Sequence, residues 1–265
     1  MLSPKNGIYN FFGYLGLSLE DKMRLIKAAG FDAVSLWGID HEWTDEEELR
    51  RLSALADTLG LEKEFIHTPF DVTGYIFEYG PKGEQAYSVI EKNVGLCSDL
   101  GVPVCVVHIT SWHHPKEITA KGRERLEALT RLAESKKVRL AAENIRHTFA
   151  LEILDRIDSP YLGFCYDSGH SLCFQKTDAD PLARYAGRLL ALHLHDNEGD
   201  RDKHALPGSG SADWQKVMGA VKASPYEGSL HLEVNADNSP EYSSLPPEEF
   251  LDKALASLGY IRSLV

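Results

Sequence analysis

The sequence predicts an α/β protein built as a single (β/α)8 barrel, and three observations support this fold class. Short apolar segments typical of strands alternate eight times with helical segments. Glycine follows several of the helical segments directly before the next strand. The length of 265 residues is typical of such a barrel, and no linker or low-complexity segment divides the chain, so we expect one domain over residues 1–265.

A doubly wound open sheet is the alternative fold. That fold carries a Gly-x-Gly-x-x-Gly motif after its first strand in dinucleotide-binding proteins, and no such motif follows the first predicted strand here. The expected strands are 7–12, 32–37, 63–67, 102–108, 138–143, 161–167, 189–195 and 229–233. The expected helices between and after them are 18–30, 44–59, 84–100, 122–135, 151–157, a helix after 181, 214–223 and 247–264.

Helix-end signals support these boundaries. Ser18 is a typical N-cap residue at the start of an apolar stripe, and Thr44 with Glu47 has the spacing of a capping box. Gly30 and Gly60 stand where a left-handed residue ends a helix. These signals place short connections between helices and strands, as a repeating βα chain requires.

Composition excludes several classes of protein. Hydrophobic residues make up 43% of the chain, enough for a buried core, but no apolar run reaches the roughly 18 residues of a membrane helix. The first residues lack the pattern of a signal peptide, and the four cysteines show no Cys-x-x-Cys spacing, which favours a cytoplasmic location. A formal net charge of −12 argues against a broad nucleic-acid surface, although bound metal can reverse the local potential.

Histidine and carboxylate side chains recur at the ends of the predicted strands. In a barrel of parallel strands these ends meet on one face, which is where such barrels hold their active sites. The recurrence in six strands is therefore hard to explain as unrelated polar positions. The residues concerned are His67, His108, Glu143, Asp167, His170, His193, His195 and Glu233, with Asp202 and His204 in the loop after the seventh strand.

Four of these residues could surround one divalent cation. Glu143, Asp167, His193 and Glu233 come from the last four strands and offer three carboxylates and one imidazole. This mixture of oxygen and nitrogen ligands suits Mn²⁺, Mg²⁺, Co²⁺ or Zn²⁺. The remaining residues could bind further ions or hold substrate hydroxyl groups.

In their order along the chain, seven short motifs resemble the xylose isomerase-like barrel superfamily, which includes sugar-phosphate isomerases and epimerases together with endonuclease IV. The resemblance covers nearly the whole chain. The motifs are His67-Thr-Pro-Phe, Val107-His108, Ala142-Glu143-Asn144, Asp167-Ser-Gly-His170, His193-Leu-His-Asp196, Asp202-Lys-His204 and Leu232-Glu233.

This resemblance implies two alternative sites. In the epimerases the metal is held by residues matching Glu143, Asp167, a histidine of strand seven and Glu233, and the match to His170 contacts substrate. In endonuclease IV three zinc ions are held by nine matching residues, all present here. These nine are His67, His108, Glu143, Asp167, His170, His193, Asp202, His204 and Glu233.

The histidine of strand seven has two candidates. His193 fits the usual His-x-x-Asp pattern, and we favour it as the metal ligand. A shift of two residues would make His195 the ligand and would place Arg201 where ketose 3-epimerases keep a substrate-binding arginine. Both imidazoles face the same way along a strand, so the pattern leaves this choice open.

As an isomerase, the protein would use metal-bound Glu143 and Glu233 as acid and base on either side of a ketose, with an enediolate as intermediate. Arg146 could bind a phosphate or acidic group through its planar fork. Trp37 and Trp112 could form an apolar wall for the sugar, and His170, His195 and Arg201 are further candidates for substrate contact.

As a nuclease, the protein would need basic loops that grip duplex DNA. The clearest basic cluster, Lys136-Lys137 with Arg139, precedes strand five and is expected on the opposite face, while the loops after strands two and eight are acidic. We therefore expect a small sugar or sugar phosphate as substrate, no nucleic acid and no membrane. A non-catalytic metal- or sugar-binding barrel is a third reading. The sequence does not decide whether the chain forms a homo-oligomer.

Overall fold

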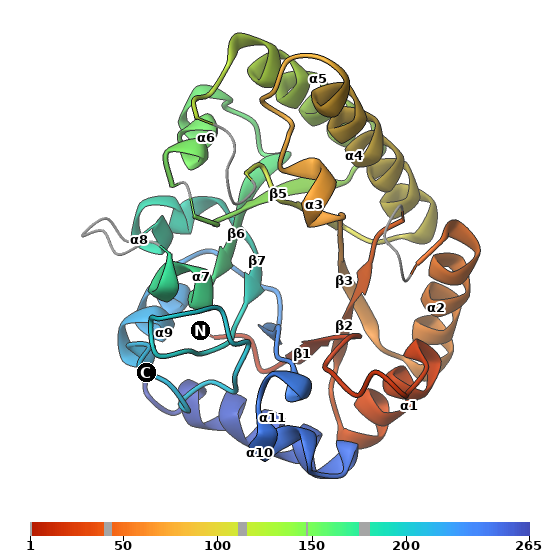
Figure 1. Ribbon diagram of the computed structural model, residues 1–265, viewed down its shortest axis with the longest axis vertical. Helices are drawn as coiled ribbons and strands as arrows, with labels where there is room; N and C mark the ends of the chain where they lie inside the picture. The colour runs from red at the N-terminus through yellow and green to blue at the C-terminus, as the bar shows by residue number, and fades with distance from the viewer. Residues whose placement is uncertain (1, 40–43, 111–115, 147, 175–180) are drawn as a thin grey trace.

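Eight parallel strands form one sheet that curves into a barrel, and the helices form a ring around it (Figure 1). The computed structural model describes residues 2–39, 44–110, 116–146, 148–174 and 181–265. The sheet order is β7-β6-β5-β4-β3-β2-β1-β8, so sequential strands are neighbours. The strands are β1 (Asn6–Tyr9), β2 (Ala33–Trp37), β3 (Glu62–His67), β4 (Val104–Val107), β5 (Arg139–Glu143), β6 (Leu162–Asp167), β7 (Leu189–His193) and β8 (Leu230–Leu232).

Backbone hydrogen bonds close the barrel between β7 and β8. The N–H of Leu194 donates to the carbonyl of His231 at 2.9 Å, and the N–H of Glu233 donates to the carbonyl of Leu194 at 3.2 Å. On the other side, β8 pairs with β1 through Ile8 and Leu232. All eight predicted strands are present, and the predicted single (β/α)8 barrel is confirmed.

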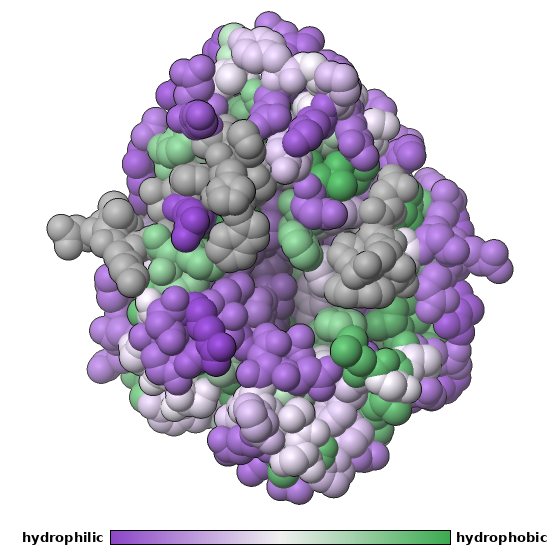
Figure 2. Space-filling model, in the orientation of Figure 1, coloured by the Kyte–Doolittle hydropathy of each residue, from purple (hydrophilic) through white to green (hydrophobic). Residues whose placement is uncertain are grey.

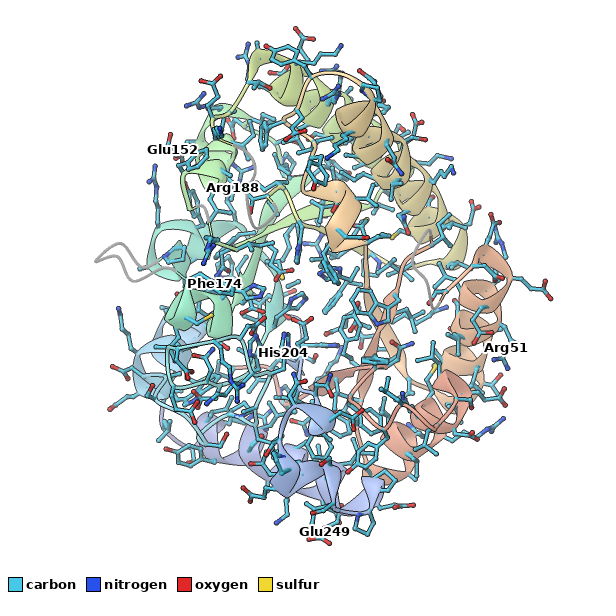
Figure 3. All side chains as sticks on the ribbon, in the orientation of Figure 1. Arg51, Glu152, Phe174, Arg188, His204 and Glu249 are labelled. Atoms are coloured by element: carbon cyan, nitrogen blue, oxygen red, sulfur yellow. The ribbon has the colours of Figure 1, made fainter. Side chains whose placement is uncertain are left out.

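In the described part of the chain, six helices of ten residues or more form most of the outer ring. They are α1 (Leu19–Ala29), α2 (Glu46–Leu59), α4 (Pro81–Leu100), α5 (Ala120–Lys136), α9 (Trp214–Ala223) and α11 (Pro247–Arg262). Charged side chains such as Arg51 and Glu249 point outward from this ring (Figure 3). Within the described ranges, no helix combines the length and the apolar character needed to cross a membrane.

Shorter helices occupy the connections. They are α3 (Phe70–Thr73), α6 (Ile153–Arg156), α7 (Ser168–Cys173), α8 (Pro181–Tyr185) and α10 (Pro240–Ser243), with 3-10 turns η1 (Thr148–Glu152), η2 (Ala186–Arg188) and η3 (Ala236–Asn238). The sequence did not predict α3, α7 or α10, because one or two turns are too short to show helical periodicity. Two of them, α3 and α7, directly follow strands that carry site residues, and this position matters for the site.

One predicted helix start was wrong and the other was right. Ser18 caps α1 by accepting the N–H of Asp21, as predicted. The predicted capping box of Thr44 and Glu47 does not form, because Asp45 is the N-cap of α2 and accepts the N–H of Glu48 at 2.8 Å. Asp is at least as good a cap as Thr, so the helix begins one residue later.

The barrel interior has an apolar middle. Tyr9, Trp37, Phe65, Val106 and other buried residues of the inner strand faces form a cluster separate from the larger core between strands and helices. Bulky side chains therefore fill the barrel, as is usual for this architecture. Polar side chains are confined to the two ends of this filling, and the carboxyl-terminal end carries the predicted site.

The opposite end of the barrel is closed by a hydrogen-bonded polar cluster. Glu64 accepts the N–H of Ser229 at 2.6 Å, the hydroxyl of Ser229 at 2.5 Å and Nδ1–H of His231 at 2.9 Å. The Nε2 atom of His231 accepts the hydroxyl of Ser35 at 2.9 Å. Burial raises the pKa of Glu64, but the hydrogen bonds from His231 and Ser229 outweigh burial and lower that pKa. Glu64 is therefore an ionised acceptor with three donors.

Replacing this acceptor is expected to destabilise the barrel. In Glu64→Ala the two donors of Ser229 and that of His231 lose their acceptor in a nearly dry interior, which we expect to cost about 2–4 kcal/mol of unfolding free energy. Urea denaturation of the metal-free chain measures it. The control is Glu62→Ala on the same strand as Glu64. It removes only an exposed ion pair with Lys5 and should lower the unfolding free energy by less than about 1 kcal/mol. Equal stability of the two variants would contradict the role given to Glu64.

Candidate metal centre

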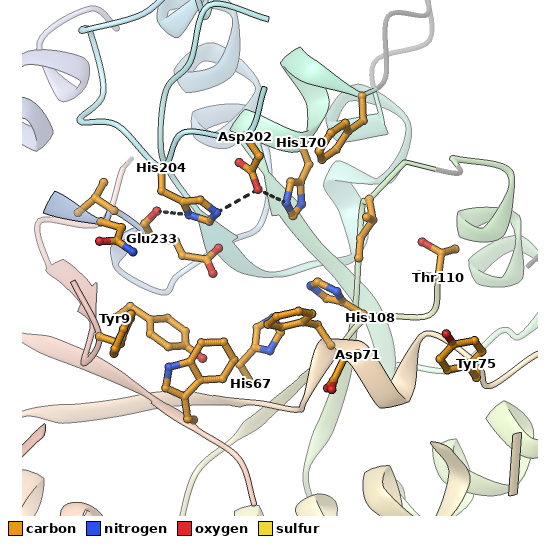
Figure 4. A pocket seen from close by; sticks show the side chains of 17 residues that line it. Tyr9, His67, Asp71, Tyr75, His108, Thr110, His170, Asp202, His204 and Glu233 are labelled. Atoms are coloured by element: carbon orange, nitrogen blue, oxygen red, sulfur yellow. Dashed lines mark hydrogen bonds and ion pairs between the residues drawn. The ribbon is translucent and has the colours of Figure 1, made fainter. Parts of the chain in front are cut away.

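A cavity of about 450 Å³ opens at the carboxyl-terminal ends of the strands. The space-filling view shows the molecule hollowed at this point (Figure 2), and the close-up shows imidazole and carboxylate groups around the hollow (Figure 4). Aromatic side chains form much of its wall. The lining residues are Tyr9, Phe11, Trp37, His67, Phe70, Asp71, Tyr75, His108, Thr110, Ile145, His170, Phe174, Asp202, His204, Glu233, Val234 and Asn235.

Glu143, Asp167, His193 and Glu233 converge at the base of this cavity. One ligand-type atom from each lies within 4.8 Å of the others. The Nδ1 atom of His193 is 2.9 Å from Oε2 of Glu233, 3.3 Å from Oε2 of Glu143 and 3.8 Å from Oδ2 of Asp167. Three of the four residues are almost completely buried, with side-chain exposures of 0–1%, whereas that of Glu233 is 16%. We call these four residues the carboxylate cluster.

A second group shares Glu143 with the carboxylate cluster. The Nε2 atoms of His67 and His108 each lie 3.1 Å from Oε2 of Glu143. The other ring nitrogen of His67 is 2.7 Å from the carbonyl of Thr68, which directs Nε2 toward the carboxylate. The three side chains therefore offer a further set of two imidazoles and one carboxylate.

A third group lies on the other side of the cavity. Asp202 stands between His170 and His204, with Oδ2 at 3.2 Å from Nε2 of the first and 3.0 Å from Nε2 of the second (Figure 4). Nε2 of His195 lies 3.8 Å from Oδ1 of the same aspartate. These four residues form the imidazole cluster, whose ligand-type atoms also lie within 4.8 Å of one another.

Asn144 holds the ends of β5 and β6 in register at the site. Its side-chain amide donates to the carbonyl of Asp167 at 2.8 Å, and its side-chain oxygen accepts the N–H of Asp167 at 2.7 Å. Asp167 in turn caps α7 by accepting the N–H of His170 at 2.6 Å. The short helix thus places His170 one turn beyond Asp167 and on the cavity side.

Asp196 organises the loop that carries Asp202 and His204. Its carboxylate accepts the backbone N–H groups of Gly208 at 2.9 Å and Ala212 at 3.1 Å, and the indole N–H of Trp214 at 2.8 Å. Because Asp196 is fully buried, these bonds tie both the far end of the loop and α9 to the end of β7. The hydrogen bonds of Asp196 therefore fix the conformation of this loop.

Neighbouring charges and hydrogen bonds shift the pKa values of Glu143 and His204. Burial raises the pKa of Glu143, but the charges of His108 and His193 and hydrogen bonds from nearby imidazoles outweigh burial and hold that pKa well below its ordinary value. Burial lowers the pKa of His204, but Asp202 raises it to about 10. A bound divalent cation would displace the extra proton of such an imidazole, because a histidine that binds a metal must be neutral.

The donor set fits a divalent cation. Among the described residues, each ion-pair partner of Glu143 and Asp167 is a histidine, so no lysine or arginine of this part of the chain pairs with these buried carboxylates. Several buried atoms also lack a hydrogen-bond partner within the described part of the chain. They are Oε1 of Glu143, both ring nitrogens of His193, Nδ1 of His195, Oδ1 of Asp202 and Oε2 of Glu233. Unsatisfied carboxylate oxygens and imidazole nitrogens in these two clusters are atoms that bound cations would satisfy.

The two histidines of the seventh strand are separated by the structure. β7 ends at His193, whose ring lies in the carboxylate cluster, while His195 lies beyond the strand end in the imidazole cluster. The geometry therefore places His193, as favoured, and not His195 beside Glu143 and Glu233. His195 is fully buried and does not line the cavity, which leaves it no direct access to substrate in this structure.

Of the other residues predicted to contact substrate, some line the cavity and others do not. Trp37 lines the cavity, as expected. Arg146 is exposed at the rim, with its guanidinium carbon 5.8 Å from the ring centre of Phe174, and Arg201 is exposed in the loop without lining the cavity. Trp112 lies outside the described residues.

Sequence reasoning missed several wall residues of the cavity. Tyr9 lies at the end of β1, and its ring centre is 6.5 Å from that of His193. Asp71 and Tyr75 come from α3 and the turn after it, and Phe174 follows α7. Tyr9 could have been found from its position at a strand end, whereas the others depend on short helices that carry no periodic signal.

The chain belongs to the xylose isomerase-like TIM barrel family, whose model matches residues 23–261. This match covers the strands from β2 to β8, and so it includes every residue of the three clusters.

The relatives of this chain include proteins named for different functions. It is 35% identical over 169 residues to the uncharacterized protein y4fM of Sinorhizobium fredii, matching 58% of this chain and about half (54%) of that protein. It is 25% identical over 227 residues to a probable endonuclease 4 of Mycobacterium tuberculosis, covering 78% of this chain and 87% of the relative. It is 21% identical over 280 residues to the L-ribulose-5-phosphate 3-epimerase UlaE of Salmonella paratyphi B, covering 97% of each.

Solved structures share the fold over nearly the whole chain. The IolI protein with a bound zinc atom superposes with a TM-score of 0.78 at 20% identity, covering 98% of each chain. L-ribulose 3-epimerase superposes with a TM-score of 0.75 at 17% identity, covering 99% of this chain and 95% of the other.

Proposed function

We propose that this protein is a divalent-metal-dependent isomerase or epimerase of a ketose, a sugar phosphate or a related polyol. The observation that carries the proposal is the carboxylate cluster at the base of a small cavity with an aromatic wall. Glu143, Asp167, His193 and Glu233 would hold the cation. The epimerase relatives and the epimerase structures of the same fold support this reading.

When bound, a divalent cation at these residues would make the hydrogen beside a carbonyl more acidic by stabilising negative charge on the substrate oxygens. The chain itself must then remove and return a proton at carbon. Glu233 is the better placed of the two predicted acid–base residues, because it lines the cavity, whereas Glu143 is 1% exposed beneath the lining. We therefore assign the proton transfer to Glu233 first and to Glu143, at the end of β5, as its partner.

The remaining cavity residues bind and orient the substrate. The aromatic rings of Tyr9, Trp37 and Phe70 present the apolar faces against which a sugar packs, while His108 and His170 offer ring nitrogens for hydroxyl groups. Neither lysine nor arginine stands among the lining residues of the described chain. This composition favours a small and weakly charged substrate, with Arg146 at the rim as the group that would meet an acidic substituent.

An endonuclease IV-like zinc phosphodiesterase is the second candidate. The observation in its favour is that all nine predicted zinc ligands lie in three adjacent clusters, and a probable endonuclease 4 is among the relatives. Duplex binding depends on many lysine and arginine contacts to phosphate. Three features favour the sugar substrate instead. The cavity wall is aromatic, its described lining residues include no lysine or arginine, and the net charge of the chain is −12.

We expect Asp167→Ala to lose divalent metal while the barrel stays folded, because the residue contributes to the carboxylate cluster and not to the apolar core. Elemental analysis after dialysis against excess metal measures the content, and circular dichroism measures the fold. Glu143→Ala should behave in the same way, and Asp200→Ala, exposed in the loop, should keep all its metal. Full metal content in both cluster variants would refute the assignment.

If Glu233 exchanges a proton with solvent, turnover of a ketose in heavy water should place deuterium on the carbon beside the carbonyl. Glu233→Gln should reduce the rate of incorporation by about 10²–10⁴-fold, because it removes the acid–base group. NMR of the recovered sugar measures the label. Product formed without deuterium at that carbon would point to a direct hydride shift and exclude the proton-transfer role.

We expect the metal-loaded protein to leave an abasic-site duplex uncleaved at low salt with Zn²⁺, while it isomerises or epimerises at least one ketose or ketose phosphate from a panel. Gel electrophoresis of a labelled duplex and chromatography of the sugars measure the two activities. Efficient cleavage that is lost in both His108→Ala and His204→Ala would instead establish the nuclease, because these residues lie outside the carboxylate cluster.

A further inference from the structure

The hydroxyl group of Thr110 is a buried polar group of the cavity wall that has no hydrogen-bond partner. Thr110 lines the cavity and is 2% exposed. Its Oγ1 atom makes no hydrogen bond within the described part of the chain. We propose that Thr110 is a specificity-determining residue that binds a free hydroxyl group at the end of the substrate remote from Glu233. The proposal rests on the proposed function and narrows its substrate to a sugar without a phosphate at this end.

A buried hydroxyl without a partner calls for an explanation. The large majority of buried polar side-chain atoms in proteins are hydrogen-bonded, because an unpaired buried hydroxyl costs free energy. Three other buried threonines of this chain, Thr68, Thr73 and Thr130, donate to backbone carbonyls at 2.7–3.1 Å. Thr44 is also buried and unpaired, but it does not line this cavity. Thr110 therefore combines an unpaired hydroxyl with a place in the cavity wall.

The fold places Thr110 across the cavity from Glu233. Thr110 comes three residues after the end of β4, and Glu233 directly follows β8. β4 and β8 are four strands apart in the ring of eight, so they lie on opposite sides of the barrel. Figure 4 shows the hydroxyl oxygen of Thr110 pointing into the hollow, on the side opposite Tyr9 and Glu233. A sugar whose reacting carbon lies at Glu233 would therefore extend its other end toward Thr110.

The chemistry of the cavity wall suits a neutral hydroxyl group at this end. A threonine hydroxyl both donates and accepts a hydrogen bond, and so it can pair with a sugar hydroxyl. Phosphate is bound most strongly by charged donors such as arginine and lysine. Neither residue type is found among the described lining residues, and Asp71 adds a negative charge to the wall. The wall therefore disfavours a terminal phosphate.

Arg146 is the alternative group for this end of the substrate. It is exposed and does not line the cavity, and its guanidinium carbon lies 5.8 Å from the ring centre of Phe174. A substrate held by Arg146 would bind better with a terminal phosphate than with a terminal hydroxyl, because the guanidinium pairs with an anion. Thr110 and Arg146 thus predict opposite substrate preferences.

A hydroxyl kept unpaired for the substrate destabilises the substrate-free chain. Thr110→Val replaces it with a methyl group of similar shape and so removes the unpaired group without opening a void. We expect the melting temperature of this variant, measured without sugar, to rise by about 2–6 °C. A hydroxyl with a structural partner would instead make the same variant less stable.

The main test compares sugars that differ only at the terminal carbon. The metal-loaded full chain is assayed with a panel of ketoses, each beside its terminal deoxy analogue and its terminal phosphate, such as D-fructose, 6-deoxy-D-fructose and D-fructose 6-phosphate. We expect kcat/KM to be about 10-fold or more higher for the free sugar than for the deoxy analogue, because the hydroxyl pair is lost with the analogue. In Thr110→Val this ratio should fall to about 2-fold or less.

Two further variants serve as controls. Thr110→Ser keeps the hydroxyl and should keep the preference for the free sugar. Thr130→Val removes a buried threonine hydroxyl on α5 that is paired with the carbonyl of Leu126 at 2.7 Å, outside the cavity. We expect this variant to have a lower melting temperature and an unchanged ratio between the two sugars.

The outcomes separate this inference from the proposed function. An equal kcat/KM for free and deoxy sugars, an unchanged ratio in Thr110→Val, or a lower melting temperature of that variant overturns the inference and leaves the proposed function in place. A higher kcat/KM for the terminal phosphate than for the free sugar also overturns it and favours Arg146. A chain that acts on no ketose, free or phosphorylated, overturns the proposed function and this inference with it.

Discussion

The buried carboxylates at the mouth of the barrel impose the constraint on which the rest of the site depends. Glu143 and Asp167 are at most 1% exposed, and ionised groups at such depth are unstable without compensating charge and hydrogen bonds. Among the described residues the compensation comes from imidazoles and not from lysine or arginine. The fold therefore brings histidines from several strands to the same place, and imidazoles and carboxylates are the side-chain types that bind divalent cations.

The constraint also explains why so much backbone structure converges on the site. Asn144 joins the ends of β5 and β6, Asp196 holds the loop after β7, and Gly169 leaves space for a buried ring. None of these three residues carries a proposed reaction. Each fixes the position of a neighbouring ligand, as outer residues around metal sites generally do. At the other end of the barrel the buried carboxylate of Glu64 is also compensated by hydrogen bonds. There His231 donates to Glu64 and accepts from Ser35, so these polar groups bond to one another.

The ligand set alone does not distinguish the activities of this family. The residues around the ligands carry that information. An aromatic cavity of about 450 Å³ without a lysine or arginine among its described lining residues suits a sugar better than a phosphodiester backbone. This feature belongs to the surroundings of the carboxylate and imidazole clusters rather than to the clusters themselves.

The sequence by itself determined the eight βα units, the face that carries the site and the residue types on that face, because periodicity and helix-end signals are local properties. The resemblance of His193-Leu-His-Asp196 to the superfamily's His-x-x-Asp motif also favoured His193 over His195 as the predicted ligand. The sequence could not resolve how the ligands divide into clusters, since period-two alternation gives the side of a strand and not the distance to another strand. Only the tertiary structure separated His193 from His195, because β7 ends between them and the chain turns away. It also decided the cavity wall, where α3 and α7 are too short for a periodic signal and depend on packing at the barrel mouth.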